Sequence, residues 1–217
     1  MGKKRLEDAL EKIEHPVEVV YRCFELDPEA KRDVDYNIYQ KLATKYGMSL
    51  EQAKASCVNM EQMAQTLGLD YHFDTMVLTN TFDAHRLAMF AKNEGLMPEI
   101  TERILHAFYT ESKHIGDHTT LTELAVEVGL SRESVAEMLA SNEMSDSVRA
   151  DEQEANQYGI RSIPFFLINK KHSLVGAQSS EAIVAALQKI IAEDGPFTNV
   201  NEAGTACDED GCDIPKK

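Results

Sequence analysis

The hydrophobic periodicity of the sequence changes twice, and these changes limit the folds that the chain can adopt. Apolar residues recur at helical spacing over residues 6–13 and alternate as in a strand over residues 17–23. From about residue 36 to residue 155 every strong signal is helical. The first three quarters of the chain therefore predict a helix, a strand and then a long helical block.

The pattern changes again after Gly159. Residues 163–168 form an apolar run typical of a buried strand, residues 169–172 are typical of a turn, and residues 173–176 suit a return strand. Apolar residues at helical spacing over 182–191 then predict a closing helix. This end of the chain therefore predicts a hairpin followed by a helix.

These two ends indicate an α/β layer that is interrupted by a helical insertion. We expect a discontinuous domain made of residues 1–35 and 156–195, with residues 36–155 as the inserted helical domain. Residues 196–217 are polar and acidic, and we expect them to form a flexible tail.

Capping residues mark helix boundaries within the helical block. Ser49 and Gln52 form a capping box at the start of one helix, and Gly68 is its expected stop signal. Thr120 and Glu123 show the same spacing and predict the start of a later helix.

The charge balance excludes several classes of function. Of 217 residues, 22 are Lys or Arg and 37 are Asp or Glu, which gives a formal net charge of -15. Phosphate backbones and anionic lipid surfaces repel such a protein, so we expect neither a nucleic acid nor a membrane as partner. The basic start of the chain is not followed by an apolar stretch, so we expect no signal peptide and a cytoplasmic location.

The four cysteines fall into two groups. Cys23 and Cys57 lie on apolar faces of their predicted elements, and we interpret both as small buried hydrophobic residues. Cys207 and Cys212 lie close together in the sequence of the acidic tail. They can form an auxiliary redox pair, or the tail that carries them can be inert. Neighbouring carboxylates raise the pKa of such thiols, so this pair is a slow nucleophile.

The sequence gives no indication of a metal or a cofactor. Cys207 and Cys212 supply only two of the four ligands of a structural zinc site. His114 and His118 stand four residues apart, but Gly116 and the following Asp interrupt a helix, and we interpret both as loop residues.

Pro164 opens the most apolar predicted strand, where a proline removes a backbone donor. One interpretation is an ordinary proline at the start of a strand. The alternative is a cis Ile163–Pro164 bond, which leaves the backbone of Ile163 free to pair with an extended peptide.

Several separated segments between residue 1 and about residue 192 resemble a known family in their order and spacing. These segments resemble the DsbA-like dithiol-disulfide oxidoreductases and isomerases of the FrnE branch. The matching segments are residues 1–7, 24–28, 80–81, 84–87, 149–152, 159–166 and 176–178.

The resemblance implies a thioredoxin fold with a large helical domain inserted after the second strand. It also implies a cis-proline loop at Ile163 and Pro164 that faces the active site and binds substrate. In that family a first strand and a Cys-Pro-x-Cys motif precede the segment that Met1, Gly2 and Lys3 resemble. We therefore expect the reactive cysteines upstream of Met1, no catalytic residue within this chain and an inactive protein as given.

Two alternatives stay open beside an oxidoreductase. One is a non-catalytic thioredoxin-like module that binds peptides or serves as a scaffold. The other is a glutathione-dependent isomerase of the hydroxychromene-carboxylate type. The expected partner is a protein with thiols or disulfides, or a small thiol, and the sequence carries no signal for an oligomeric state.

Overall fold

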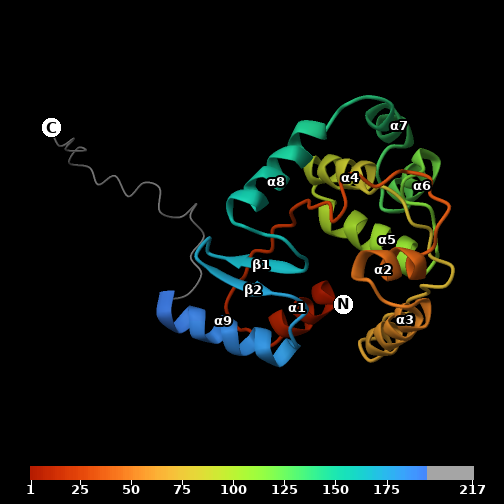
Figure 1. The fold of residues 1–217 in the computed structure, drawn as a ribbon. Coiled ribbons are helices and arrows are strands. Elements are labelled where there is room, and N and C mark those ends of the chain that lie inside the picture. Colours follow the sequence, from red (N-terminus) through yellow and green to blue (C-terminus); the bar gives the residue numbers. More distant parts are fainter. Residues whose placement is uncertain (195–217) are drawn as a thin grey trace, which may run out of the picture.

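The computed structural model describes residues 1–194, in which a small sheet and two helices lie beside a larger group of helices (Figure 1). We refer to residues 36–155 as the helical block and to residues 1–35 and 156–194 as the sheet layer. The elements are, in chain order, α1 (Gly2–Leu10), α2 (Ile38–Tyr46), α3 (Leu50–Gln65), α4 (Phe82–Asn93), α5 (Met97–Tyr109), α6 (His118–Glu127), α7 (Arg132–Ala140), α8 (Ser145–Gln157), β1 (Phe165–Ile168), β2 (His172–Val175) and α9 (Ser180–Asp194).

The predicted hairpin is confirmed. Strands β1 and β2 pair antiparallel, with Phe165 opposite Val175 and Ile168 opposite His172. Asn169 in the turn has a φ of 52°, a left-handed conformation that asparagine adopts more readily than most residues.

Helices α1 and α9 pack against each other beside the hairpin (Figure 1). Their contact buries Ala9, Ile183 and Leu187, and Ile168 and Leu174 of the hairpin pack against this cluster. The apolar faces that the helical spacing predicted for both segments therefore meet in one shared core.

The helical block has a larger core, centred on α4. Helices α5, α6, α7 and α8 all pack against α4. Its completely buried side chains include Leu87, Ile100, Leu121, Leu124, Val135, Met138 and Val148. A smaller cluster of Cys57, Phe73 and Met76 joins α3 to the loop that follows it.

The strand predicted over residues 17–23 does not form. This segment is extended, but within residues 1–194 it makes no backbone hydrogen bond to another backbone group, and Val20 is 52% exposed. A strand needs the backbone of a neighbour, and the only partner of β1 in the described part of the chain is β2. Alternation of apolar residues alone could not supply that neighbour.

Helix boundaries agree with the predicted caps in one case and differ in another. The capping box of Ser49 and Gln52 is present. Helix α6 begins at His118 rather than after Thr120, because the Asp117 carboxylate accepts the backbone N–H of Thr120 at 2.8 Å. The prediction that His118 is a loop residue was therefore wrong.

Cys23 and Cys57 are buried, with 2% and 3% exposure, as predicted.

Within residues 1–194 none of the helices combines the length and apolar character that crossing a membrane requires.

Candidate functional site

The start of α1 lies directly against Pro164. Gly2 is buried, and a Cβ atom added there would lie 2.5 Å from Cγ and 2.8 Å from Cβ of Pro164. Atoms cannot approach this closely, so the contact requires a residue without a side chain at position 2. The Ile163–Pro164 peptide bond is cis.

Two further contacts fix this loop from the other side. The backbone N–H of Gly176 donates to the Pro164 carbonyl at 2.9 Å, and the Arg5 guanidinium donates to the Ala177 carbonyl. Gly176 has a φ of 77°, which favours glycine at this turn. The start of α1 is thus tied to both ends of the hairpin, which lies more than 150 positions away in the sequence.

Next to this contact, the backbone of Ile163 has hydrogen-bonding groups without a backbone partner among the described residues. Its backbone N–H and C=O make no backbone hydrogen bond within the described residues, and the residue is 47% exposed. An extended peptide can pair with such a backbone.

The N-terminus of α1 is electropositive. The first N–H groups of a helix lack intrahelical acceptors, and the helix dipole adds partial positive charge there. The first turn of α1 contains no acidic residue, and Lys3 lies in it, paired to Glu7 at 2.5 Å and to Glu102 of α5 at 2.6 Å. Negative charge on a sulfur atom would be stabilised at this end of α1.

The Met1 amine also contacts the helical block. It donates a hydrogen bond to the Tyr71 hydroxyl at 3.0 Å. Burial, and secondly the charge of Arg5, lower the pKa of this amine. The site is therefore formed by both the sheet layer and the helical block.

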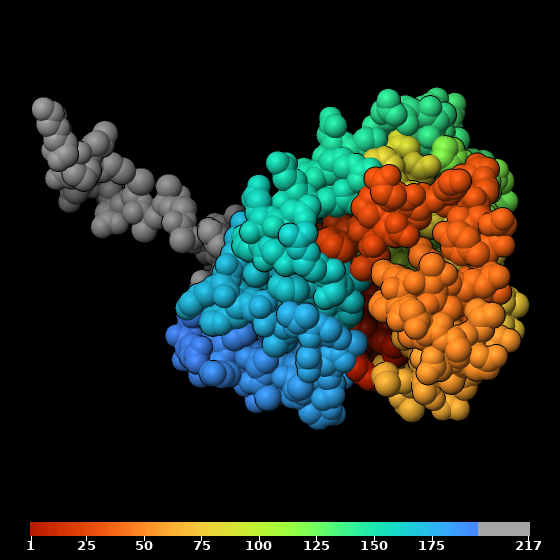
Figure 2. All heavy atoms as spheres, viewed as in Figure 1, coloured from red at the N-terminus to blue at the C-terminus, as the bar shows by residue number. Residues whose placement is uncertain are grey.

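A cleft of about 420 Å³ runs along α1 from this region, between α9 and the end of α3. The surface is hollowed where the blue and orange parts of the chain face each other (Figure 2). The cleft is lined by Arg5, Asp8, Glu11, Lys12, Leu67, Ser179, Ser180 and Glu181. The lining carries charges of both signs, which suits a polar peptide segment better than a purely anionic ligand.

The two described cysteines do not belong to the site. Burial, together with Asp151 and Glu152, raises the pKa of Cys23 to about 12. Burial also raises the pKa of Cys57, which lies in the middle of α3. Both thiols are buried and have raised pKa values, so little of either is present as the thiolate that starts disulfide exchange. Cys207 and Cys212 lie outside the described residues.

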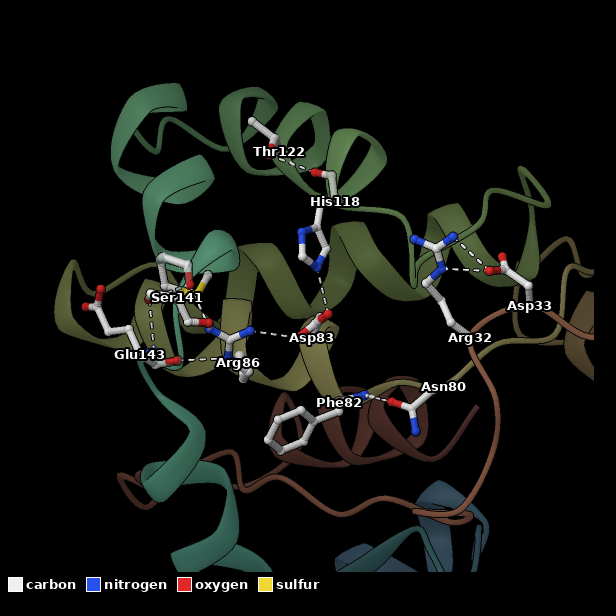
Figure 3. Close-up of polar contacts among 11 residues, drawn as sticks. Arg32, Asp33, Asn80, Phe82, Asp83, Arg86, His118, Thr122, Ser141 and Glu143 are labelled. Atoms are coloured by element: carbon white, nitrogen blue, oxygen red, sulfur yellow. Dashed lines mark hydrogen bonds and ion pairs between the residues drawn. The ribbon is translucent and has the colours of Figure 1, made fainter.

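A polar network elsewhere in the molecule has a structural role (Figure 3). The buried Arg86 donates to Asp83 on its own helix, and His118 contacts the same carboxylate. Arg86 also donates to the carbonyls of Met138, Ser141 and Glu143. Its guanidinium thus binds carbonyls in the last turn of α7 and in the residues that follow it.

A second network joins the extended segment to α8. The Asp151 carboxylate accepts the backbone N–H of Cys23 and pairs with Arg22, each at 2.8 Å. Arg149 pairs with Glu25 at 2.7 Å, while burial raises the pKa of Glu25. These contacts fix residues 22–25, which have no strand partner within the described residues.

Sequence reasoning pointed to Ile163 and Pro164 but not to Gly2 or Tyr71. The only local hint of the Gly2 contact is the glycine itself, because alanine is favoured over glycine within a helix. Tyr71 lies in a loop without periodicity, so nothing in the local sequence distinguishes it.

Comparison with known proteins gives an independent result for nearly the whole chain. Residues 1–188 match the DsbA-like thioredoxin domain. A probable DsbA oxidoreductase from Streptomyces coelicolor is 37% identical, with a TM-score of 0.88 over 99% of this chain and 93% of that chain.

Two further relatives are more distant. An uncharacterised protein of Bacillus subtilis, YwbO, is 28% identical over 77% of this chain and 79% of its own length. A putative protein disulfide isomerase from Nitrosomonas europaea is 20% identical, with a TM-score of 0.56 over 66% of this chain and 76% of that chain, and shows the fold alone. On the match of residues 1–188, this chain belongs to the DsbA-like thioredoxin family.

Proposed function

We propose that this protein is a thiol-disulfide oxidoreductase that exchanges dithiols and disulfides with protein substrates, at the start of α1. The packing of Gly2 against Pro164 is the observation that carries the proposal. It brings an electropositive helix end beside a loop whose Ile163 backbone is free to bind a peptide. The family match supports the same reaction class.

In the proposed reaction a cysteine thiolate attacks one sulfur of a substrate disulfide. A mixed disulfide forms, the substrate S–S bond breaks, and the second substrate sulfur leaves as a thiolate that takes up a proton. A second enzyme thiol then attacks the mixed disulfide and releases the substrate dithiol. The enzyme dithiol is thereby oxidised and the substrate reduced, and the reverse sequence oxidises a substrate.

The residues of this chain have separate tasks in that reaction. The start of α1 stabilises the thiolate, because its N–H groups and dipole favour negative charge. The backbone of Ile163 pairs with the substrate chain, and Pro164 holds this loop against Gly2. The cleft along α1 accommodates the polar residues that flank the substrate cysteine.

We also propose that the reactive dithiol lies immediately N-terminal to α1, on a further strand of the sheet. Residues 17–23 and the second edge of β1 both lack backbone partners within residues 1–194, which supports such a strand. In this proposal residues 1–217 alone cannot carry out the exchange.

The test is to compare residues 1–217 with a version extended by the codons that precede Met1 in the gene. We expect reduction of insulin disulfides only by the extended protein, with a higher melting temperature. Serine in place of each added cysteine should abolish the activity. Equal turnover and equal melting temperature of the two proteins would show that the active centre has been misplaced.

The same experiment separates the alternatives. An extended protein that binds unfolded peptides without turnover would be a binding module. An extended protein that carries a serine in the first cysteine position and catalyses a glutathione-dependent isomerisation would be an isomerase. In either case the oxidoreductase proposal would be wrong.

We propose in addition that Cys207 and Cys212 form a reversible disulfide under mild oxidation. Their spacing in the sequence closes a small loop, for which chain entropy gives a stabilisation of only about 2 kcal/mol. Peptide mapping of the oxidised protein should find the two cysteines linked to each other. Linkage of either residue to Cys23 or Cys57 would contradict the proposal.

A further inference from the structure

Glu25 is a buried carboxylate at the junction between the sheet layer and the helical block. It lies in the extended segment between α1 and α2, and its side chain is completely buried. Its Oε2 atom accepts a hydrogen bond from the Arg149 guanidinium of α8 at 2.7 Å. Its Oε1 atom is buried and has no hydrogen-bond partner among residues 1–194. One oxygen of this carboxylate is therefore paired and the other is not.

A second carboxylate faces the same guanidinium. The Nη1 atom of Arg149 also donates to Glu152 at 2.6 Å, and the backbone N–H of Glu25 donates to Glu152 at 3.3 Å. Arg149 lies over the ring of Phe82, whose centre is 4.2 Å from the Cζ atom of the guanidinium. The two carboxylates thus share one cation, which the aromatic ring holds in place.

Other charged groups near the junction have partners of their own or carry little charge. On the segment of Glu25, Arg22 pairs with Asp151 at 2.8 Å, and Asp27 pairs with Lys41 at 2.9 Å. The ring of His85 on α4 lies close enough for the carboxylates of α8 to act on its charge. Burial lowers the pKa of this histidine, so its ring is mostly uncharged at neutral pH.

This environment favours a proton on the two carboxylates. Burial is the largest cause that raises the pKa of Glu25, and the charge of Glu152 acts in the same direction, against Arg149. When two carboxylates interact this closely, a bound proton belongs to the pair rather than to one residue. With one proton bound, Arg149 balances the single negative charge that remains.

We propose that Glu25 and Glu152 form a proton-dependent contact between residues 22–25 and α8: the contact is strongest while the two carboxylates share one proton, and it weakens as that proton is lost to solvent. Loss of the proton leaves two negative charges on one cation, with Oε1 of Glu25 buried and unpaired. Separation from α8 lets water reach this oxygen, which relieves the cost of burying an unpaired charge.

The contact can open because residues 22–25 form no backbone ladder with another segment of residues 1–194. Their backbone N–H groups are instead bound by carboxylates of α8, at Cys23 and at Glu25. The proton therefore acts where side chains alone join the two parts of the molecule. This inference does not rest on the proposed function.

The first test is an NMR titration of residues 1–217 that follows the side-chain carboxyl carbons of the glutamates. We expect one signal to titrate above the range of the exposed glutamates and to be absent from Glu25→Gln. Glu152→Gln should lower the pKa of that signal, because it removes the neighbouring negative charge. Glu154→Gln is the control, since this residue of α8 pairs with Arg22 instead. If no glutamate titrated above the ordinary range, the inference would be overturned.

The second test asks whether the proton controls the contact. The N–H groups of Cys23 and Glu25 donate to carboxylates of α8, so their hydrogen exchange reports its opening. Their protection factors should fall by up to tenfold per pH unit between the ordinary glutamate pKa of about 4.3 and the raised pKa of the pair, and level off above it. The reason is that each opening in this range releases one proton. Protection of Leu124, in the core of the helical block, should stay constant.

Variants assign this pH dependence to the pair. Glu25→Gln should keep its protection as the pH rises, because an amide stays neutral and still accepts the hydrogen bond from Arg149. Glu154→Gln should follow the unmodified protein. A fall in protection that persists in Glu25→Gln would assign the effect to His85 or Asp151 and overturn the inference. Constant protection of Cys23 and Glu25 in the unmodified protein would overturn it as well.

Discussion

The helical block and the sheet layer are built from the same chain but differ in how completely they satisfy their backbone. Helices α4 to α8 pair their backbone groups internally and bury a continuous core. In the sheet layer only the hairpin forms a ladder, and residues 17–23 remain extended with Val19 and Val20 exposed. A helix carries its hydrogen-bond partners within itself, whereas a strand depends on another segment.

Residues of the helical block also bond to and pack against residues of the sheet layer. Cys23 belongs to the core of the block, and Asp151 of α8 accepts its backbone N–H. Tyr71 of the block reaches the start of α1. Residues of the helical block thus support the sheet layer both along its extended segment and at the start of α1.

Arg86→Met tests the helical block at its most highly connected side chain. The change removes donors to Asp83 and to the carbonyls of Met138, Ser141 and Glu143, so we expect a loss of about 3 kcal/mol or more of unfolding free energy. Urea unfolding measures the loss. Arg132→Met, at an exposed position without an ion pair among residues 1–194, is the control and should change the stability little.

Gly2→Ala tests the sheet layer where α1 meets Pro164. Alanine normally favours a helix by about 1 kcal/mol over glycine, but the added Cβ collides with the proline ring. We expect a net loss of about 1–3 kcal/mol, as in other overpacked contacts.

Thermal unfolding of Gly2→Ala and of Glu11→Ala provides the comparison, because Glu11 is exposed just after α1. A gain in melting temperature for Gly2→Ala would show that α1 is not packed against Pro164 as described.

Ser49→Ala tests how far local signals alone stabilise the helical block. The serine caps α3 and accepts the N–H of Gln52, so its loss should lower the unfolding free energy by about 1 kcal/mol. Ser56→Ala, at an exposed position inside the same helix, should leave the stability unchanged or raise it slightly. A Ser49 effect as small as that of Ser56 would mean that tertiary contacts alone define the start of α3.

The ion pairs of Glu111 should make a smaller, pH-dependent contribution to the stability of the helical block. Burial acts to raise its pKa, but the cations of Arg103 and Lys113 outweigh this and hold the pKa at about 2. The folded state therefore gains stability above the ordinary glutamate pKa of about 4.3, and this gain is lost as the pH falls towards 2.

Glu111→Gln should reduce the loss of stability between pH 5 and pH 2 by about 1 kcal/mol or less, because solvent screens this partly exposed group. Urea unfolding across this pH range measures it. Glu133→Gln, exposed and without an ion pair in residues 1–194, should follow the unmodified protein. Parallel curves for all three proteins would exclude a role for Glu111.

The helices and the hairpin could be predicted because their signals are local. The capping box of Ser49 and Gln52 and the apolar spacing of α9 each involve residues within a few positions of one another. The start of α6 was misplaced because Asp117 competed with Thr120 as the cap, and a capping pattern alone does not show which side chain reaches the free N–H.

The candidate site shows the limit of such signals. The resemblance pointed to Ile163 and Pro164, and the cis bond is present. Neither periodicity nor spacing could show that Gly2 would lie against Pro164, or that Tyr71 would reach Met1. These contacts join residues that are 70 or more positions apart.

The sequence by itself determined the order of the helices and the closing hairpin, the helical character of residues 36–155 and the burial of Cys23 and Cys57, because short-range periodicity sets which face of an element is apolar. Only the tertiary structure decided that residues 17–23 stay unpaired within the described chain and that the start of α1 meets Pro164 and Tyr71. Pairing and close contact depend on which distant backbone and side chains occupy the neighbouring space, and local sequence does not contain that information.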